Sequence, residues 1–494
     1  MSKRLPQGLK HAFWSLLDTA IYPVFYLATV PIMLHYLGAT LFGFWILINT
    51  IITILQVFNF NLGYTALIRI SHAQGKGLLS RVSELINALL KITFLQWLAL
   101  IAMGSLAAVI IGRTRYLDSY SIPIHQASLC VFWAAILAGL KYLEQLFQNI
   151  IKAYDQFRTA AILNMISRFG SLGISLLLAA TYHADILVIL VGNVAFSITY
   201  LIIHFLVINK VLPFYKPSIK TVPGLEKQLI AFSMWPWIQS ILVILTFQGD
   251  RLWVSTFSGL KTLALYGLVA TMFNHIHMIF MAMVTWVFPR LIRMEAQQKN
   301  SYEWYQQISG LFTCISIGLL LLFYFSSPFL IRTWLGNENY GQMKYFIRAF
   351  TVFEILYVHT ILPFYLLNGT GSEKKATIFT FGYCALCYVL MLGAMYGMGR
   401  PEALVEGMAL SMVISVPVLQ ELVNRQYGQG LKYWDLFLGI LPSFLCMALV
   451  YTNVLWLQIL FLIGAGFLFW RYHLSSFFNS GLWKQFFRGT ITSG

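Results

Sequence analysis

The stretch VPIMLHYLGATLFGFWILINTIITILQVFNFNLGYTALIR (30–69) is almost free of charge, with His35 and Arg69 as its only basic side chains and no acidic one. Apolar residues continue on both sides of the short segment LGATLFG at 37–43, without the alternation that is typical of a half-buried β-strand. A helix needs about 20 mostly apolar residues to cross the hydrocarbon core of a bilayer. The stretch therefore predicts the end of one membrane-spanning helix, a tight turn and a second spanning helix.

The composition of the whole chain agrees with this prediction. Of its 494 residues, 59% are hydrophobic and 10% are charged, whereas soluble domains average about 45–50% and about 25%. The mean hydropathy is +0.73. So few charged side chains cannot cover the surface of a soluble fold, which excludes a soluble enzyme, a disordered chain, a coiled coil and a secreted disulfide-rich scaffold. We therefore predict an all-α integral membrane protein.

Apolar runs of membrane-spanning length recur along the chain. Fourteen are expected to be transmembrane helices, at 12–36, 41–67, 85–111, 124–147, 159–181, 185–208, 228–248, 263–288, 304–325, 344–368, 376–398, 404–423, 434–451 and 453–473. With the N-terminus inside, the cytoplasmic segments carry about three times as many Lys and Arg residues as the outer loops. Because cytoplasmic loops are enriched in basic residues, both termini are predicted to be cytoplasmic.

Two parts of the chain suggest an internal duplication. Segments 12–45 and 231–267 both begin with Ala-Phe, contain a proline and end in a glycine-containing turn before the next span. Transporters are often built from such repeats, with the substrate held between them. We expect two pseudo-symmetric six-helix lobes around a central cavity, plus two extra C-terminal helices. The predicted parts are a lobe at 1–208, a basic linker at 209–227, a second lobe at 228–424, and the extra helices with a cytoplasmic tail at 425–494.

Basic side chains inside the predicted spans are candidates for binding an anionic substrate. Arg168, Arg348 and Lys91 lie within spans five, ten and three. An arginine stays charged, so at depth it needs water, a carboxylate on another helix or an anionic ligand. Lys91 is close enough to the cytoplasmic end of its helix to reach the lipid headgroups instead. Lys141 and Glu144 are three residues apart and are expected to pair locally.

Acidic and amide side chains inside the spans are further candidates. Asp18 and Glu354 lie in spans one and ten, where desolvation favours the protonated carboxyl and so suits ion coupling. The alternative is that each is a fixed counter-ion of a buried arginine. Asn49 and Gln56 lie on one polar stripe of the second span. This stripe can line a hydrated substrate path or form hydrogen bonds between helices.

The sequence gives little support to other kinds of site. The five cysteines lie within apolar runs, and Cys384 and Cys387 have no second Cys or His pair nearby, so no metal site is expected. The net charge of +16 predicts contact with anionic membrane lipids rather than nucleic acid. No phosphate-binding glycine loop occurs, and no predicted outer loop is long or acidic enough for a membrane glycosyltransferase. We expect neither enzymatic activity nor a cofactor.

Three stretches carry a resemblance to a known family. Residues 30–69, with Gly38, Gly43 and Trp45, resemble the first two helices of the polysaccharide flippases of the O-antigen type. These belong to the multidrug/oligosaccharidyl-lipid/polysaccharide exporter superfamily. KAYDQFRTAAILNMISRFGSL (152–172) and LLNGTGSEKKATIF (366–379) are also similar to that family. Asn61 stands where the family often has an acidic residue, so no role of that acid is carried over.

The resemblance implies a V-shaped pair of six-helix lobes in the bacterial inner membrane. It implies the transfer of undecaprenyl-pyrophosphate-linked oligosaccharide from the cytoplasmic to the periplasmic leaflet, driven by a proton or sodium gradient. It also allows contacts with other membrane proteins of polysaccharide assembly. Two alternatives stay open: a multidrug-type cation antiporter of the same superfamily, and a polytopic membrane glycosyltransferase or polymerase. The sign of the charge along the substrate path separates the first alternative from a flippase.

Overall fold

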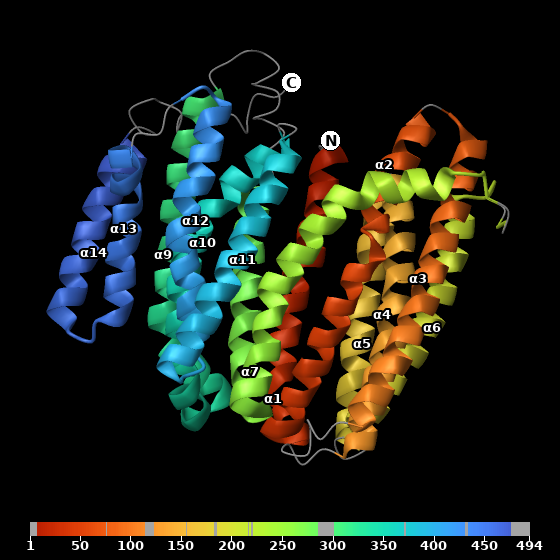
Figure 1. Ribbon diagram of the computed structural model, residues 1–494, viewed down its shortest axis with the longest axis horizontal. Helices are drawn as coiled ribbons and strands as arrows, with labels where there is room; N and C mark the ends of the chain where they lie inside the picture. The colour runs from red at the N-terminus through yellow and green to blue at the C-terminus, as the bar shows by residue number, and fades with distance from the viewer. Residues whose placement is uncertain are drawn as a thin grey trace, which may run out of the picture. The chain divides into compact units, whose positions relative to one another are not determined.

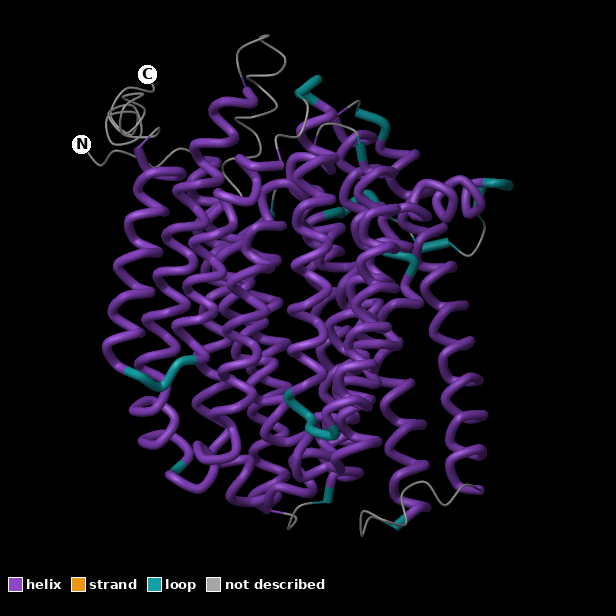
Figure 2. The backbone as a smooth tube through the Cα atoms, turned by 60° about the vertical axis from the view of Figure 1, so that its left-hand side comes forward, coloured by secondary structure: helices purple, strands orange, loops and turns teal. Residues whose placement is uncertain are grey.

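The computed structural model describes residues 7–75, 77–113, 123–154, 156–181, 185–215, 217–218, 221–284, 301–369, 372–429 and 433–475, with the backbone alone for 7–24, 433–437 and the positions 75, 236, 282, 301, 368, 369 and 373. In these ranges every regular element is a helix, and none is a strand (Figure 2). This agrees with the predicted all-α fold. The chain divides into two compact units, Met1–Gly267 and Leu268–Gly494, which are described separately below.

The first unit contains the helices drawn from red to green in Figure 1. They are α1 (Gln7–Leu55), the 3-10 helix η1 (Gln56–Asn59), α2 (Leu62–Gly75), α3 (Leu79–Arg113), α4 (Ile124–Ala153), α5 (Phe157–Thr181), α6 (Ile186–Val211) and most of α7 (Leu225–Val284). The boundary between the units falls inside α7, later in the chain than the linker at 209–227. The reason is that the part of α7 before the boundary packs on α1 and η1.

The second unit begins with the last part of α7 and ends with a short π-helical turn. Its other elements are α9 (Ser301–Leu335), α10 (Asn337–Gly369), α11 (Glu373–Met398), α12 (Ala403–Gln426), α13 (Tyr433–Tyr451), α14 (Leu455–Phe469) and the π-helical turn η3 (Trp470–Leu474). Prolines interrupt the hydrogen-bond ladders of α9, α10, α12 and α13. Such prolines are tolerated in membrane helices because neighbouring groups satisfy the freed carbonyls.

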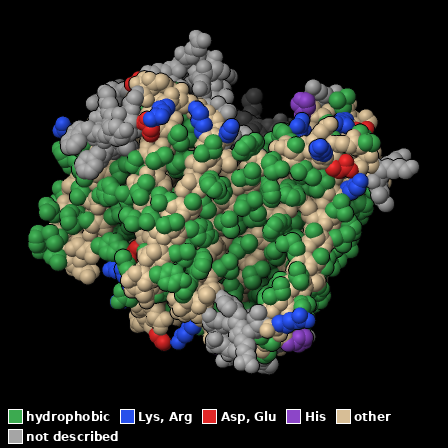
Figure 3. Space-filling model, viewed as in Figure 1, with side chains coloured by type: hydrophobic (Ala, Val, Ile, Leu, Met, Phe, Trp, Pro, Cys, Tyr) green, Lys and Arg blue, Asp and Glu red, His purple; other side chains and the backbone are tan. Residues whose placement is uncertain are grey.

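The fourteen predicted spans all fall on helices. Eleven segments of the described chain are long and apolar enough to cross a membrane. Two of them, Phe25–Asn59 and Trp237–Met281, each cover two predicted spans, and α13 is a shorter apolar helix. Large apolar side chains also remain exposed on the outer helix faces, such as Leu322 and Phe329 at 66% and 72%. Figure 3 shows hydrophobic side chains over the middle of the helices, with most Lys and Arg side chains nearer the helix ends, as a lipid environment requires.

A single glycine makes the turn between the first two spans. Gly38 has φ 68° and ψ 169° inside α1, and Gly259 has φ 80° and ψ 170° inside α7. This backbone region is open almost only to glycine. The two turns lie in the two segments that suggested a duplication, and the same glycine conformation gives both the same local geometry.

The arms that follow these turns pack closely within the first unit. A Cβ atom on Gly43 of α1 would lie 1.9 Å from the carbonyl oxygen of Leu260, the residue after the turn in α7. Only a glycine permits this approach of two backbones. Further along, the core gathers α2, α3, α4 and α6 around buried residues such as Ile70, Leu89 and Ile150. The helix crossings of the first unit therefore rest on small residues and close van der Waals packing, as in other membrane bundles.

We expect Gly38→Ala to destabilise the protein by about 1–3 kcal/mol through backbone strain alone. A Cβ atom at this position meets nothing within 4 Å, so steric conflict does not contribute. The melting temperature of the purified protein in detergent measures the effect. Gly173→Ala is the matched control, because it also adds a methyl group in open space but has no positive φ. Equal melting temperatures for the two variants would contradict the assigned role of Gly38.

Candidate functional site

The second span of the first unit is interrupted. α1 ends at Leu55, η1 covers the next four residues, and Phe60 and Asn61 have φ values of 49° and 51° before α2 begins. Left-handed conformations cost a residue with a side chain roughly 1–2 kcal/mol, and asparagine tolerates them better than phenylalanine. Two such residues in succession stop the regular helix and change its direction.

Side chains from other helices donate hydrogen bonds to backbone carbonyl groups at this interruption. The Tyr142 hydroxyl of α4 donates to the Leu55 carbonyl oxygen. The Trp237 indole N–H of α7 donates to the Val57 carbonyl oxygen at 2.7 Å. Asn61 donates its backbone N–H to Asn59 Oδ1 at 2.7 Å. The backbone groups released by the break are thus bonded by defined partners, which marks the break as a built feature of the fold.

Amide side chains surround the break. Asn59 Nδ2 donates to Gln145 Oε1 of α4 at 2.9 Å, and Asn149 Nδ2 donates to the Gln145 carbonyl oxygen at 2.8 Å. The predicted site residue Gln56 is the first residue of η1, three residues before Asn59, and is partly exposed. The other predicted amide, Asn49, donates to the Trp45 carbonyl oxygen of its own helix at 2.8 Å. The structure therefore places Gln56 in the broken segment itself, whereas the Asn49 amide is bonded to its own helix.

A buried ion pair connects α4 and α5. Lys141 Nζ lies 2.9 Å from both carboxylate oxygens of Glu144, which confirms the expected local pair. The Ser167 hydroxyl donates to the same carboxylate at 2.6 Å, and Glu144 is 3% exposed. The predicted site residue Arg168 follows Ser167 on α5 and is exposed.

Lys91 of α3 is held at the first turn of α7. Its Nζ lies 3.1 Å from Glu226 Oε1 and 3.3 Å from Thr221 Oγ1. The Thr221 hydroxyl also donates to Glu226. The bond from Thr221, followed by the backbone and Lys91 contributions, lowers the pKa of Glu226 to about 2. Lys91 is thus an ion-pair partner that links α3 to the start of α7, and its side chain stays exposed.

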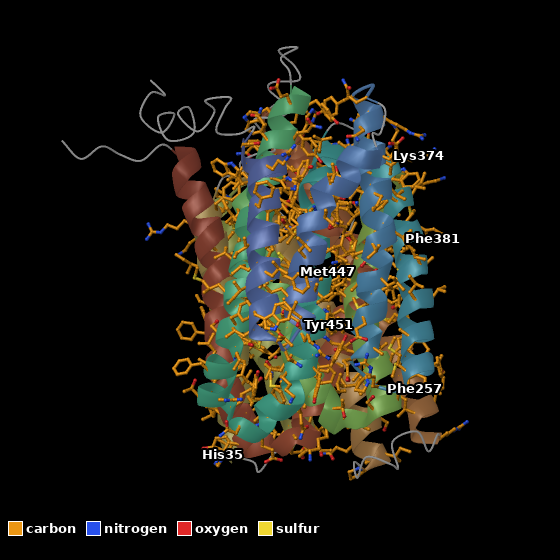
Figure 4. All side chains as sticks on the ribbon, turned by 90° about the vertical axis from the view of Figure 1, so that its left-hand side faces the viewer. His35, Phe257, Lys374, Phe381, Met447 and Tyr451 are labelled. Carbon is orange, nitrogen blue, oxygen red and sulfur yellow. The ribbon has the colours of Figure 1, made fainter. Side chains whose placement is uncertain are left out.

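Arg348 of the second unit is held by aromatic rings. Its guanidinium carbon lies 4.8 Å from the ring centre of Tyr451 and 5.7 Å from that of Tyr345. Among the residues that the structure describes, no carboxylate lies within ion-pair distance of it. Figure 4 places Tyr451 well away from Lys374, the residue near the start of α11. Arg348 therefore lies toward the other end of this unit from Lys374.

The tyrosine that covers Arg348 is part of a longer polar chain. Its hydroxyl donates to Glu406 Oε1 at 3.0 Å, and Glu406 Oε2 accepts a bond from Arg400 at 2.7 Å. Glu406 belongs to the first turn of α12, and Arg400 precedes that helix. Glu406 is thus occupied by Arg400 and Tyr451, so Arg348 keeps its positive charge without a direct acidic partner in the described chain.

Glu354 forms the most buried acidic site of the second unit. Its Oε1 lies 2.7 Å from His277 Nδ1 of α7, and the two side chains are 3% and 12% exposed. The His277 ring stacks on Tyr357, with ring centres 4.3 Å apart. The alternative expectation that Glu354 is the counter-ion of Arg348 is wrong, since its described partner is a histidine. Glu354 and Tyr357 are three residues apart on α10, so they lie on the same face of the helix and can contact one partner, here His277. This spacing is visible in the sequence.

Two aspartates, Asp18 and Asp250, are the remaining acidic candidates of the first unit. The side chain of the predicted coupling residue Asp18 lies outside the described residues. Asp250 was missed, because the predicted span ended at 248 and the following residues were read as an outer loop. In the structure α7 continues to Gly259, Asp250 is 2% exposed, and its Oδ2 accepts a bond from Tyr266 at 2.5 Å. Within the described ranges, no three His, Cys, Asp or Glu residues are grouped to hold a metal ion.

We expect Lys91→Gln and Glu226→Gln each to lower the thermal stability by at most about 1 kcal/mol, the range for an exposed ion pair. Since each change breaks the same contact, the double variant should be no less stable than either single variant. Folding lowers the pKa of Glu226. The stability that the ionised Glu226 contributes is therefore fully present above its ordinary pKa of 4.5 and is lost as the pH falls toward 2. Melting temperatures between pH 7 and pH 3 test this. Additive losses would show that the two residues act independently.

Comparison with known proteins identifies the family. The family model described as polysaccharide biosynthesis protein matches residues 9–295. No curated protein gives a sequence match.

Solved structures are similar in fold. An inward-facing multidrug resistance MATE family transporter of the MOP superfamily aligns with a TM-score of 0.65 at 11% identity, over 85% of this chain and 98% of that chain. The MATE multidrug transporter DinF-BH aligns with a TM-score of 0.61 at 15% identity, over 85% and 96%. A MOP superfamily transporter from Pyrococcus furiosus, described as having a binding pocket of reverse polarity, aligns with a TM-score of 0.53 at 10% identity, over 85% and 95%. The chain has the fold of these membrane transporters, and it belongs to the polysaccharide biosynthesis protein family.

Proposed function

We propose that the protein is a flippase that moves undecaprenyl-pyrophosphate-linked oligosaccharide from the cytoplasmic to the periplasmic leaflet. The observation that carries the proposal is the combination of a polysaccharide biosynthesis family match with the fold of membrane transporters. Growing glycans are assembled on lipid carriers at a membrane surface, so a transporter in this family has a lipid-linked glycan as its natural substrate. Alternating access between the two membrane faces is the mode of transport that internal repeats support.

The charge of the chain suits an anionic substrate. Arg168 and Arg348 are permanently charged, and aromatic faces rather than a carboxylate cover Arg348 in the described chain. A guanidinium under a tyrosine ring keeps donor groups for a phosphate, which it binds with two parallel hydrogen bonds. Lys91 has an exposed face at the predicted cytoplasmic surface, where it can meet the pyrophosphate before transfer. We assign these three residues to the path of the carrier headgroup.

A buried carboxyl and imidazole suit coupling to an ion gradient. Glu354 and His277 share one hydrogen bond at 2.7 Å and are almost fully enclosed. A carboxyl and an imidazole are both groups that can bind a proton, and their contact lets one proton be held between them. We propose that this pair, together with Asp18 of the first unit, couples transfer to a proton or sodium gradient. No cofactor is part of this mechanism.

The proposed setting is the bacterial inner membrane, with both termini cytoplasmic. The threefold excess of basic residues in alternate loops supports this orientation. Membrane lipids and the lipid-linked oligosaccharide are the proposed partners, and the other membrane proteins of polysaccharide assembly are natural neighbours. Substrate made on the cytoplasmic face would then be delivered to the outer face for polymerisation.

The second candidate is a multidrug-type cation antiporter, which the likeness to MATE multidrug transporters favours. A cationic drug needs an acidic partner in its path. Glu144, Asp250 and Glu354 are the buried carboxylates of the described chain, and each already bonds to a lysine, a tyrosine or a histidine. The charge of the described side chains therefore suits an anion better. A polytopic glycosyltransferase finds no support in the family match or in the fold.

We expect Arg168→Ala and Arg348→Ala each to slow transfer at least about 10-fold, because loss of one charged hydrogen bond costs about 1.5–3 kcal/mol. Liposomes containing the purified protein and a fluorescent lipid-linked oligosaccharide give the transfer rate. Arg332→Ala is the matched control, since Arg332 also lies 4.8 Å from the ring centre of a tyrosine, Tyr340. Normal rates in both test variants would remove these arginines from the mechanism. Failure of the wild-type protein to transfer the lipid would refute the proposed function.

Glu354→Gln is expected to abolish the acceleration of transfer by an imposed ion gradient, while slow transfer without a gradient persists. The amide keeps the size of the carboxyl group but cannot exchange a proton at neutral pH. The same liposomes, prepared with and without a pH or sodium gradient, provide the measurement. Glu338→Gln on the first turn of the same helix is the control. A variant that responds to the gradient as the wild type does would exclude Glu354 as the coupling residue.

A further inference from the structure

The interrupted second span carries neutral polar side chains that the mechanism above does not use. We propose that the break at residues 56–61, together with Gln145 and Asn149 of α4, is a subsite for the glycan part of the substrate. This inference rests on the proposed function, since it takes the substrate to be a glycan on a lipid carrier. It adds a recognition site for sugar to a mechanism that so far concerns only the pyrophosphate and the ion gradient.

The break is held in place by the rest of the first unit. Phe60 and Asn61 keep their left-handed conformations against a cost that a regular helix would avoid. Tyr142 and Trp237 fix the carbonyl groups of Leu55 and Val57. Such irregular backbone at membrane depth is tolerated only where protein covers it or where it lines a polar cavity. Unwound segments of this kind form binding sites in transporters.

Several amide groups at the break have unused hydrogen-bonding capacity. In the described part of the chain, the side chains of Gln56 and Asn61 make no hydrogen bond to protein groups, and both residues are partly exposed. Gln145 accepts a hydrogen bond through Oε1, and its Nε2 donor has no partner among the described residues. Asn149 donates through Nδ2, and its Oδ1 acceptor has no partner among them either. A polar group in an apolar medium costs free energy unless it is bonded. These amide groups are therefore available to water or to a polar ligand.

The chemistry of these groups matches a sugar. Each amide presents a donor and an acceptor, and so does each sugar hydroxyl or N-acetyl group. None of Gln56, Asn59, Asn61, Gln145 and Asn149 is charged at neutral pH, so the group does not favour the pyrophosphate. The Phe60 and Trp237 rings meet edge to face beside these amides at 4.4 Å between centres, and both are partly exposed. Aromatic surface beside a few directional polar groups is the usual composition of a small-molecule site.

A sodium ion is the competing occupant, because unwound backbone carbonyls ligate sodium in some transporters. Two observations disfavour it here. The Leu55 and Val57 carbonyls, which the break releases, already accept bonds from Tyr142 and Trp237. The residues of the break also lack a carboxylate, which would balance the charge of the ion. A neutral polyhydroxyl ligand is the occupant that the remaining groups support.

The test compares two ligands on purified protein in detergent: undecaprenyl pyrophosphate, with and without a linked N-acetylglucosamine. The key variant is Gln56→Met/Asn61→Gly. Methionine keeps the length of the glutamine side chain, and glycine keeps the left-handed backbone, so both amides are lost while the break is preserved. Gln306→Ala is the matched control, since Gln306 is an exposed amide that bonds to Tyr302 of its own helix.

We expect the wild type to bind the sugar-bearing carrier more tightly than the bare one. The double variant should lose about 10-fold in affinity for the sugar-bearing carrier and retain its affinity for the bare carrier. Equal losses for both carriers, no loss for either, or a sodium-dependent affinity that the variant abolishes would each overturn the subsite. If the double variant fails to bind the bare carrier through misfolding, Gln56→Met alone decides, because it leaves the residues with positive φ unchanged.

The two proposals fail in different ways. If the wild-type protein does not bind undecaprenyl pyrophosphate at all, the proposed flippase function fails. If it binds the bare carrier but the added sugar does not strengthen binding, only the glycan subsite is refuted. The loss of glycan-dependent affinity is also distinct from the effect of Arg168→Ala, which should weaken the binding of both carriers together.

Discussion

The structure depends on one constraint: in the hydrocarbon core of a bilayer, every backbone N–H and C=O group needs a partner inside the protein. Helices provide these partners within one segment, which explains why the described chain is helical throughout its regular elements. The same constraint explains where helices stop. The chain turns at Gly38 and Gly259, where glycine alone permits the required conformation. It breaks at Phe60 and Asn61 only because Tyr142 and Trp237 bond to the released carbonyl groups.

The ionisable side chains of the described chain follow a related rule. Glu144 bonds to Lys141 and Ser167, Asp250 bonds to Tyr266, and Glu354 bonds to His277, so these buried acids each have a local hydrogen-bonding partner. Arg348 is different, since tyrosine rings rather than a carboxylate cover it. A carboxylate would neutralise the arginine, whereas an aromatic face lowers the cost of burial and leaves its charge available. This difference is why a site for an anion is more consistent with the second unit than a site for a cation.

Much of the fold could be predicted from the sequence, but less of the site. Run length and composition predicted the fourteen spans, because both properties are read directly from residues that must face lipid. The Lys141–Glu144 pair was also predictable, since three residues along a helix bring side chains together. The His277–Glu354 pair was not, because it joins residues from distant parts of the chain. Asp250 was missed for another reason: α7 continues past the predicted end of its span, and polar residues near a glycine turn resemble a loop.

The break in the second span is a feature of the fold that also determines the chemistry of a site. Within QVFNFN (56–61), neither the propensity of asparagine nor the apolar residues around it reveals that the backbone leaves the helix. Once the break is known, its polar groups can be counted, and those without partners identify the chemistry of what must bind there. In the proposed mechanism the arginines bind only the phosphate of the carrier, which carries no information about the glycan. Discrimination between one glycan and another needs directional neutral groups, because a site built to bond a hydroxyl strongly rejects a ligand that lacks it. The amides at the break are neutral, directional groups of this kind, so the proposed glycan subsite would let glycan specificity and affinity for the carrier be adjusted separately.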